Sequence, residues 1–520
     1  MKKFIFALLL FFLSFSKAVA ADFEKVNWDT VKVKEIDALI KSGADVNVAN
    51  KAGMTPLMTS VLNNGNPFVA EALIDAGADV NASNKDGMTP LMIAAANNGN
   101  PSVIKTLIKA GAEVNAHKDG MTPLMIAALF NKNPAVVEAL IKAGAEVNAS
   151  NKDGMTPLMV SVLNNGNPAI TKALIKAGAE LNARNKKGVT PLMRAAANNE
   201  NPAIIDALIK AGADVNAHKD GMTPLMIAAL FNKNPVIIDA LIKAGADVNA
   251  TNKEGMTPLL GAATNNENPA IIQALIKAGA DISSAGKDGT PLKVAAEKNK
   301  NPEIIAALVK AGADIGERDE NGMTLLMIAA EKNGNPAIIE ALIKSGADVN
   351  ARNKKNMTSL MLAAEKNKNP EIIETLIKAG AEVNARNKKG VTPLMRAVAY
   401  NGNPAITEAL IKAGAEVNSH NQDGMTPLMR AAASNKNPMI VETLIKAGAD
   451  INAHNKEGLT PLMIAVANNE NPAIIEALIN AGAEMGARDK NGKAAFDYAE
   501  ENPKLKGSAI YWKLNDLKYK

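Results

Sequence analysis

The sequence predicts a mainly α-helical solenoid, in which short helix–turn–helix repeats stack into an elongated array. Three observations predict this fold class. The chain has 520 residues, more than one compact hydrophobic core usually serves. The same short phrases recur at a fixed period, which is the sequence signature of repeat proteins. Aromatic residues make up only 3% of the chain, so the core is expected to consist of many small, similar helix contacts.

The first twenty residues are typical of a secretory signal peptide. Lys2 and Lys3 form a basic start, an apolar run follows from Phe4 to Phe15, and residues 18–20 form a small-x-small cleavage site. The alternative of a membrane anchor is disfavoured, because the run is shorter than the ~20 residues that a span needs. We therefore expect export to the periplasm or the medium, and no membrane span after cleavage.

The composition argues against several classes of function. Cleavage would remove Lys2, Lys3 and Lys17 and lower the formal net charge from +5 to +2, so we expect no nucleic-acid partner. The chain has no Cys, which excludes disulfides, thiol nucleophiles and Cys-ligated metals. It contains no Walker loop, Gly-rich dinucleotide turn, nucleophile elbow or paired-His zinc motif. We expect a protein that is not an enzyme, with no cofactor and no metal.

Each repeat opens with a Thr, and the interval between these residues is 33 or 34. In the repeat of residues 87–119, Thr89 is a good helix N-cap and the Pro after it suits the first helical position. Asn100, also followed by Pro, starts a second helix in the same way, and Gly111 follows that helix, where a left-handed residue commonly ends one. Each repeat is therefore expected to be two short helices and a polar loop, whose apolar faces are buried only by stacking. The thirteen opening residues are Thr55, Thr89, Thr122, Thr156, Thr190, Thr223, Thr257, Thr290, Thr324, Thr358, Thr392, Thr426 and Thr460.

The repeats divide the chain into four parts. Residues 1–20 are the signal peptide, and residues 21–52 form a partial repeat that caps the N-terminal end. Thirteen repeats occupy residues 53–487, and residues 488–520 form a C-terminal capping repeat and tail. Both Trp and three of the four Tyr lie in the end segments, as expected of caps that close a continuous core.

The phrases "GMTPLM" and "ALIKAGADVNA", with their period, resemble the ankyrin repeat over about residues 22–500. The resemblance implies two antiparallel helices and a protruding β-hairpin finger in each repeat, stacked into a curved solenoid. It also implies that partner proteins bind the concave face, through the fingers and the first helices. The family usually has His after Thr-Pro-Leu, where eleven repeats here have Met, so packing must replace the hydrogen bond of that His. The loop between the helices is also one residue longer than usual.

One phrase, "KDGMTPLMIAALFNKNP", stands at residues 118–134 and again at 219–235. The separation of 101 residues equals two repeats of 34 and one of 33. We infer that the chain grew by copying blocks of three repeats. The second copy is therefore a structural template and not a duplicated active site.

The candidate partner-binding residues interrupt otherwise regular columns of the repeat. Large side chains at the end of the first helix are plausible anchors, although packing of Phe130 against the neighbouring repeat is equally well supported. Arg residues replace an apolar residue after the core Met, and nine Met precede the Thr at the base of the fingers, where gap filling is the favoured role. The candidates are Leu129, Phe130, Leu230, Phe231, Tyr400, Arg194, Arg396, Arg430, Met88, Met121 and Met222.

The function expected from the sequence is a monomeric scaffold that binds another protein. The alternatives are a released factor that binds host proteins, a structural spacer, and an oxidant sink built from Met. Residues 283–362 depart most from the repeat pattern, where neutral drift is favoured over a hinge or a specialised site.

Overall fold

A computed structural model describes residues 23–517 apart from residues 24, 165–166, 199 and 470. The predicted signal peptide lies outside the described residues. The chain divides into two compact units, Met1–Lys253 and Glu254–Lys520, here called the N-terminal and the C-terminal unit. In both units the described residues form helices, turns and coil, with four isolated β-bridges. The predicted all-helical repeat solenoid is confirmed.

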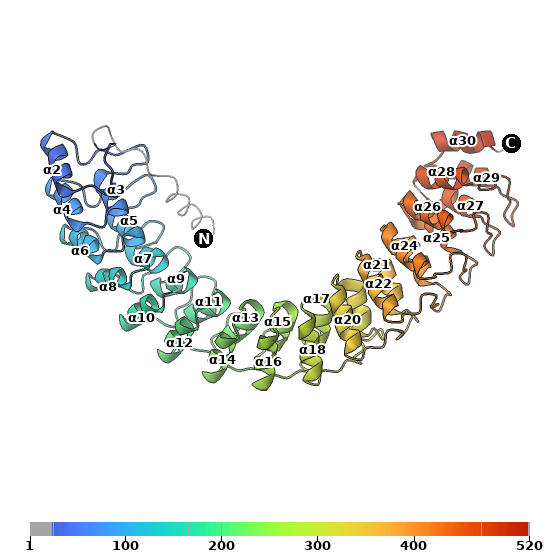
Figure 1. Ribbon diagram of the computed structural model, residues 1–520, viewed down its shortest axis with the longest axis horizontal. Coiled ribbons are helices and arrows are strands. Elements are labelled where there is room, and N and C mark those ends of the chain that lie inside the picture. Colours follow the sequence, from blue (N-terminus) through green and yellow to red (C-terminus); the bar gives the residue numbers. More distant parts are fainter. Residues whose placement is uncertain (1–22, 24, 165–166, 199, 470, 518–520) are drawn as a thin grey trace. The chain divides into compact units, whose positions relative to one another are not determined.

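In the N-terminal unit the helices form two layers, because each first helix packs on the first helix of the next repeat and each second helix on the next second helix (Figure 1). Among the described residues, helix α2 (Val33–Lys41) precedes the full repeats. The first helices are α3 (Pro56–Asn63), α5 (Pro90–Asn97), α7 (Pro123–Phe130), α9 (Pro157–Asn164), α11 (Pro191–Asn198) and α13 (Pro224–Phe231). The second helices are α4 (Pro67–Asp75), α6 (Pro101–Lys109), α8 (Pro134–Lys142), α10 (Pro168–Lys176), α12 (Pro202–Lys210) and α14 (Pro235–Lys243).

The C-terminal unit has the same two layers and ends in α29 (Ala495–Glu501) and α30 (Ala509–Leu517). Its first helices are α15 (Pro258–Asn265), α17 (Pro291–Lys298), α19 (Leu325–Lys332), α21 (Ser359–Lys366), α23 (Pro393–Tyr400), α25 (Pro427–Ser434) and α27 (Pro461–Asn468). Its second helices are α16 (Pro269–Lys277), α18 (Pro302–Lys310), α20 (Pro336–Lys344), α22 (Pro370–Lys378), α24 (Pro404–Lys412), α26 (Pro438–Lys446) and α28 (Pro472–Asn480).

The predicted helix caps are present in every repeat. The Oγ1 atom of each opening Thr accepts a hydrogen bond from the backbone N–H three residues later, at 3.2–3.3 Å. The Asn before each second helix accepts one from the N–H two residues later, at 2.9–3.1 Å. Leu325 and Ser359 replace the helix-starting Pro, yet α19 and α21 begin there because the Thr cap is retained.

The fingers are short closed turns. In the first, the Asn50 N–H donates to the Met54 carbonyl at 3.0 Å, while Asn50 Oδ1 accepts from the N–H groups of Ala52 and Met54. Gly53 has φ of 79°, and a Cβ there would lie 2.7 Å from the backbone N of Lys85 in the next finger. The predicted hairpin is thus reduced to its turn. Successive fingers stack so closely that a residue larger than Gly would clash at this position.

The core is a layer of small and aliphatic side chains between the helices. Met58, Met92 and Met125, at the position where the related repeats have His, are fully buried. Packing therefore occupies this position, as the sequence predicts.

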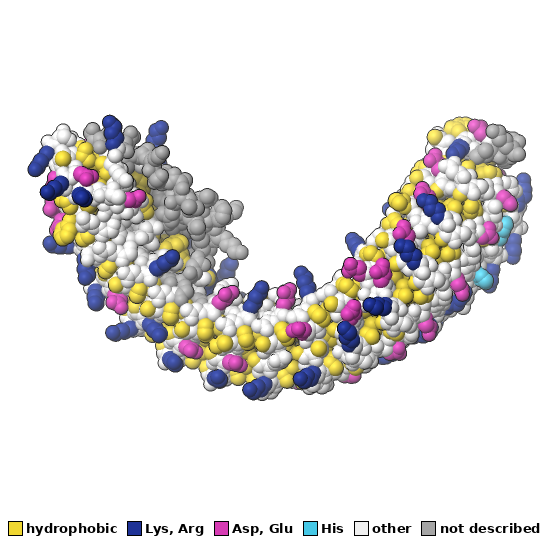
Figure 2. All heavy atoms as spheres, viewed as in Figure 1, with side chains coloured by type: hydrophobic (Ala, Val, Ile, Leu, Met, Phe, Trp, Pro, Cys, Tyr) yellow, Lys and Arg dark blue, Asp and Glu magenta, His cyan; other side chains and the backbone are white. Residues whose placement is uncertain are grey.

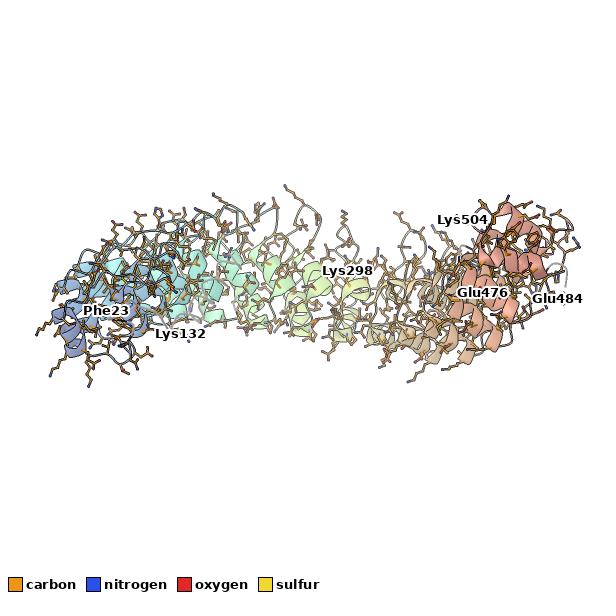
Figure 3. The ribbon with its side chains drawn as sticks, turned by 90° about the horizontal axis from the view of Figure 1, so that it is seen from above. Phe23, Lys132, Lys298, Glu476, Glu484 and Lys504 are labelled. Atoms are coloured by element: carbon orange, nitrogen blue, oxygen red, sulfur yellow. The ribbon has the colours of Figure 1, made fainter. Side chains whose placement is uncertain are left out.

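The two chain ends bear aromatic side chains. Phe23, at the N-terminal end in Figure 3, is fully buried, and its ring stacks on Trp28 at a centroid distance of 5.9 Å. At the other end the ring of Tyr511 lies 5.3 Å from that of Phe496, while Trp512 is largely exposed. Phe23 and Trp28 thus form a buried aromatic pair at the N-terminal end, while the cap that the sequence predicts there stays a prediction.

Candidate functional site

A ladder of buried Asn side chains joins successive repeats. In most of the described repeats, the Asn after the first helix donates both Nδ2 protons to two backbone carbonyls of the preceding repeat; for Asn98 these are Val61 at 2.9 Å and Asn64 at 3.0 Å. Asn98 Oδ1 also accepts the N–H of Asn100, so the whole amide is satisfied. The described members of this Asn ladder are Asn64, Asn98, Asn131, Asn232, Asn299, Asn333, Asn367, Asn401, Asn435, Asn469 and, in the cap, Asn502.

A second set of Asn side chains joins the loops that lead to the fingers. Asn81 Nδ2 donates to the carbonyl of Gly111 at 3.0 Å, and its Oδ1 accepts the N–H of Glu113 at 2.9 Å. Asn350 bonds Gly380 and Glu382 in the same way. Sequence reasoning missed both ladders, although an Asn at the same two places in nearly every repeat was a visible signal.

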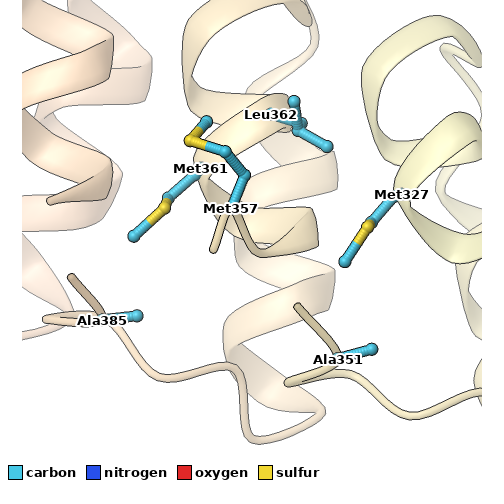
Figure 4. Close-up of a cluster of buried hydrophobic side chains, with 6 residues drawn as sticks. All are labelled: Met327, Ala351, Met357, Met361, Leu362 and Ala385. Carbon is cyan, nitrogen blue, oxygen red and sulfur yellow. The ribbon is translucent and has the colours of Figure 1, made fainter. Parts of the chain in front are cut away.

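The Met column at the base of the fingers is largely structural. Asn of the next finger donates Nδ2 to the Met sulfur in seven pairs, at 3.2–3.6 Å, for example Asn84 to Met54. Figure 4 shows Met357 and Met361 lying between Ala351, just before the finger that ends at Met357, and Ala385, just before the next finger. Among the candidate residues, Met88 and Met121 are buried and Met222 is half-buried. Met88 and Met121 therefore offer little surface to a partner.

The surface of interest is formed by the fourth, seventh and eighth residues of the first helices, here called the first-helix face. Phe231 and Tyr400 stand at the eighth position, one in each unit, and are 56% and 54% exposed. Phe130 and Leu230 are half-buried, and Leu129 is buried. Although residues 118–134 and 219–235 are identical, only in the second copy is the Phe at the end of the first helix more than half exposed.

The three candidate Arg residues occupy the fourth position of their helices and are half-buried. Burial lowers the pKa of Arg194 below its ordinary value. Arg396 pairs with Glu365, with Nη1 3.3 Å from Oε2, and its Nη2 donates to the sulfur of Met357 at 3.3 Å. Arg430 Nη2 donates to the hydroxyl of Tyr400 at 3.2 Å. The structure thus brings Arg396, Tyr400 and Arg430 together and keeps Arg194 in the other unit.

Tyr400 lies between two cations. The guanidinium carbons of Arg396 and Arg430 are 5.6 and 5.8 Å from the centroid of its ring, within the range of cation–π attraction. On the face shown in Figure 2, acidic and basic side chains are interspersed among hydrophobic and other groups in each unit. The Arg–Tyr–Arg group stands out chemically because an exposed ring and two guanidinium groups share one small area.

The four His residues are exposed side chains of the finger region. In the described part of the chain, no three His, Asp or Glu side chains are grouped so that they could hold a metal ion. None of the described helices combines the length and the apolar character that crossing a bilayer requires.

The family model for ankyrin repeats in three copies matches nearly the whole chain. A search of curated proteins finds no match. The matched segments overlap and cover residues 31–118, 95–185, 162–252, 225–319, 292–387, 360–455, 394–489 and 428–507.

Proposed function

Since the chain belongs to the ankyrin-repeat family, and is on that basis a protein–protein interaction scaffold, we propose that it binds its partner through the first-helix face and the fingers. We propose that this is the concave side of the solenoid that the sequence predicts. We propose further that it acts after export, in the cell envelope or outside the cell, as the sequence of residues 1–20 indicates. Ankyrin repeats are generally non-enzymatic, and we propose no reaction for this chain.

One observation carries the proposal. Phe231 and Tyr400 are the exposed aromatic side chains at the ends of first helices, where most repeats have a small or polar residue. An exposed aromatic ring leaves apolar surface in contact with water, which a bound partner would bury. Rigid aromatic side chains are common anchors of protein interfaces. Each unit thus presents one anchor on the same face of its repeats.

The experiment is crosslinking of the mature chain in its native compartment, followed by mass spectrometry of what it captures. We expect one dominant partner, and we expect Phe231→Ser and Tyr400→Ser to reduce its capture. Phe68→Ser is the matched control, because Phe68 is 63% exposed but lies on the second helix α4. Capture that falls equally in the control, or a scatter of weak captures unchanged in all variants, would contradict the proposal.

The alternatives give different results in the same experiment. A released factor that binds host proteins would appear in the culture fluid and would bind there. A structural spacer would be insensitive to Phe231→Ser and sensitive to removal of whole repeats. The oxidant sink requires accessible sulfur atoms, and burial of Met54, Met88 and Met121 weighs against it.

A further inference from the structure

A row of ion pairs runs along the first-helix face of the C-terminal unit. Each cation pairs with a Glu of the preceding repeat, and this Glu stands at the seventh position of the first helix of that repeat. Lys332 Nζ lies 2.9 Å from Glu297, and Lys366 pairs with Glu331, whose hydrogen bond raises the pKa of Lys366. The third pair is Arg396 with Glu365. The row begins at α17, whose last residue, Lys298, is marked in Figure 3.

The row stops at Arg430. This residue has the same position in α25 as Arg396 has in α23, but the place of Glu365 one repeat later is taken by Ala399. In the described part of the chain, Arg430 forms no ion pair, and the Tyr400 hydroxyl is the acceptor that the structure gives it. Its Nε is buried without a hydrogen-bond partner, as are those of Arg194 and Arg396. A guanidinium with five N–H donors is thus left with most of them unused.

The surroundings of Arg430 fit a carboxylate. The Tyr400 ring holds the guanidinium carbon at 5.8 Å from its centroid, which limits the orientations of the planar group. A planar guanidinium binds carboxylates through two parallel hydrogen bonds. The exposed face of Tyr400 beside it can cover the apolar part of the residue that supplies the carboxylate.

We propose that the C-terminal unit binds an acidic segment of another protein, one carboxylate of which takes at Arg430 the place that Glu365 takes at Arg396. The proposal rests on the proposed function, since it names the chemistry of the partner at the same face. The Arg–Tyr–Arg group (Arg396, Tyr400 and Arg430) is the recognition site. Arg430 binds the carboxylate, and Tyr400 contacts the adjoining side chain.

The experiment measures fluorescence anisotropy of a fluorescein-labelled peptide of alternating Glu and Ala, titrated at low salt with the whole mature chain. The same peptide with Gln in place of Glu is the ligand control. We expect the Glu peptide to bind, and Arg430→Ala to weaken its binding about tenfold, because a charge-assisted bidentate contact is lost. Lys412→Ala is the matched protein control: it removes one exposed cation from the second helix α24 of the same unit, outside the first-helix face, and should leave the affinity unchanged.

A second variant tests the site without removing the Arg. Ala399→Glu places a carboxylate where Glu365 stands one repeat earlier, so Arg430 should gain an internal partner and lose the peptide to a similar extent. Equal affinity of the wild type, Arg430→Ala and Ala399→Glu for the Glu peptide would overturn the inference. So would no binding of that peptide, or equal binding of the Gln peptide.

Crosslinking of the same variants separates this inference from the proposed function. If the wild type captures a dominant partner and Arg430→Ala captures it equally, only the carboxylate inference fails. If the wild type captures no specific partner, the proposed function fails.

Discussion

The side-chain amide of Asn98 donates a hydrogen bond to the backbone carbonyl of Asn64, the residue at the same place one repeat earlier. The same relation joins Asn401 to Asn367 at 2.7 Å and Asn435 to Asn401 at 3.1 Å. Each amide is buried, and each has an acceptor that belongs to the neighbouring repeat. The ladder therefore stabilises the stacking of repeats and not the single repeat.

Replacement of a ladder Asn should loosen the stack. Asn64 donates to the carbonyls of Trp28 and Val31 at 3.0 and 3.2 Å, and Asn64→Ala would leave these buried groups without a donor. We expect a loss of about 2 kcal/mol in the stability of the N-terminal end, the usual cost of buried polar groups left unsatisfied. The measurement is urea unfolding followed by Trp28 fluorescence, with Trp512 replaced by Phe.

The neighbouring residue provides the control. Asn63 Nδ2 donates to the Thr59 carbonyl within its own helix, so Asn63→Ala removes no contact between repeats. Its unfolding midpoint should stay near that of the parent. An equal shift in the two variants would show that the ladder contributes nothing specific.

Oxidation should begin at the surface and not in the Met column. Met439, on α26, is 56% exposed, whereas Met54 and Met88 are 3% and 5% exposed. Because peroxide must reach the sulfur, we expect Met439 to become sulfoxide well before the other two. Peptide mapping by mass spectrometry after timed exposure to peroxide measures the order. Early oxidation of Met54 and Met88 in the folded chain would restore the oxidant sink as an explanation.

The C-terminal cap should weaken at alkaline pH. Burial, and next the hydrogen bond from the Tyr498 hydroxyl to Asp489 at 2.7 Å, raise the pKa of Tyr498 to about 12, from an ordinary value of 10.0. A pKa raised in the folded state means that the stabilisation is complete below the unfolded pKa and is lost as the pH rises through 12. Tyrosinate absorbance during an alkaline titration should show a late step near pH 12, which Tyr498→Phe removes. Tyr400→Phe, in the middle of the unit, should leave that late step in place.

The helices of residues 283–362 should be protected from hydrogen exchange to the same degree as the neighbouring helices. Asn299, Asn333 and Asn367 complete the ladder through this segment, and Thr324 and Thr358 keep their helix caps. With both kinds of bond in place, we expect α19 and α21 to exchange as slowly as α23. Faster exchange confined to α17–α21 would favour the hinge.

The sequence predicts the local structure well, because each helix boundary depends on residues within one repeat. Thr89 and Asn100 are both followed by Pro, and this pattern alone places the start of each helix. The role of Asn98 could not be predicted in the same way, since its acceptors lie in another repeat and depend on the path of the loop.

The candidate surface is predicted less evenly. Phe231 and Tyr400 are exposed, as expected of anchors, but Phe130 belongs to the same phrase as Phe231 and is half-buried. A copied sequence does not specify its own exposure, because exposure depends on the neighbours that cover it. The absence of a Glu at the position of Ala399 likewise becomes meaningful only because Glu365, one repeat earlier, pairs with Arg396.

The Asn ladder allows whole repeats to be added to or removed from the chain. Each described Asn of the ladder donates to backbone carbonyls of the preceding repeat, and residues 28–31 supply the acceptors for the first of these Asn, Asn64. Deleting or inserting a whole repeat therefore leaves every remaining amide with its partners. Recombination between identical phrases, such as those at 118–134 and 219–235, would yield shorter or longer chains that still fold. Recombination can thus change the number of repeats at little cost in stability. The binding side chains move together with the repeats that carry them.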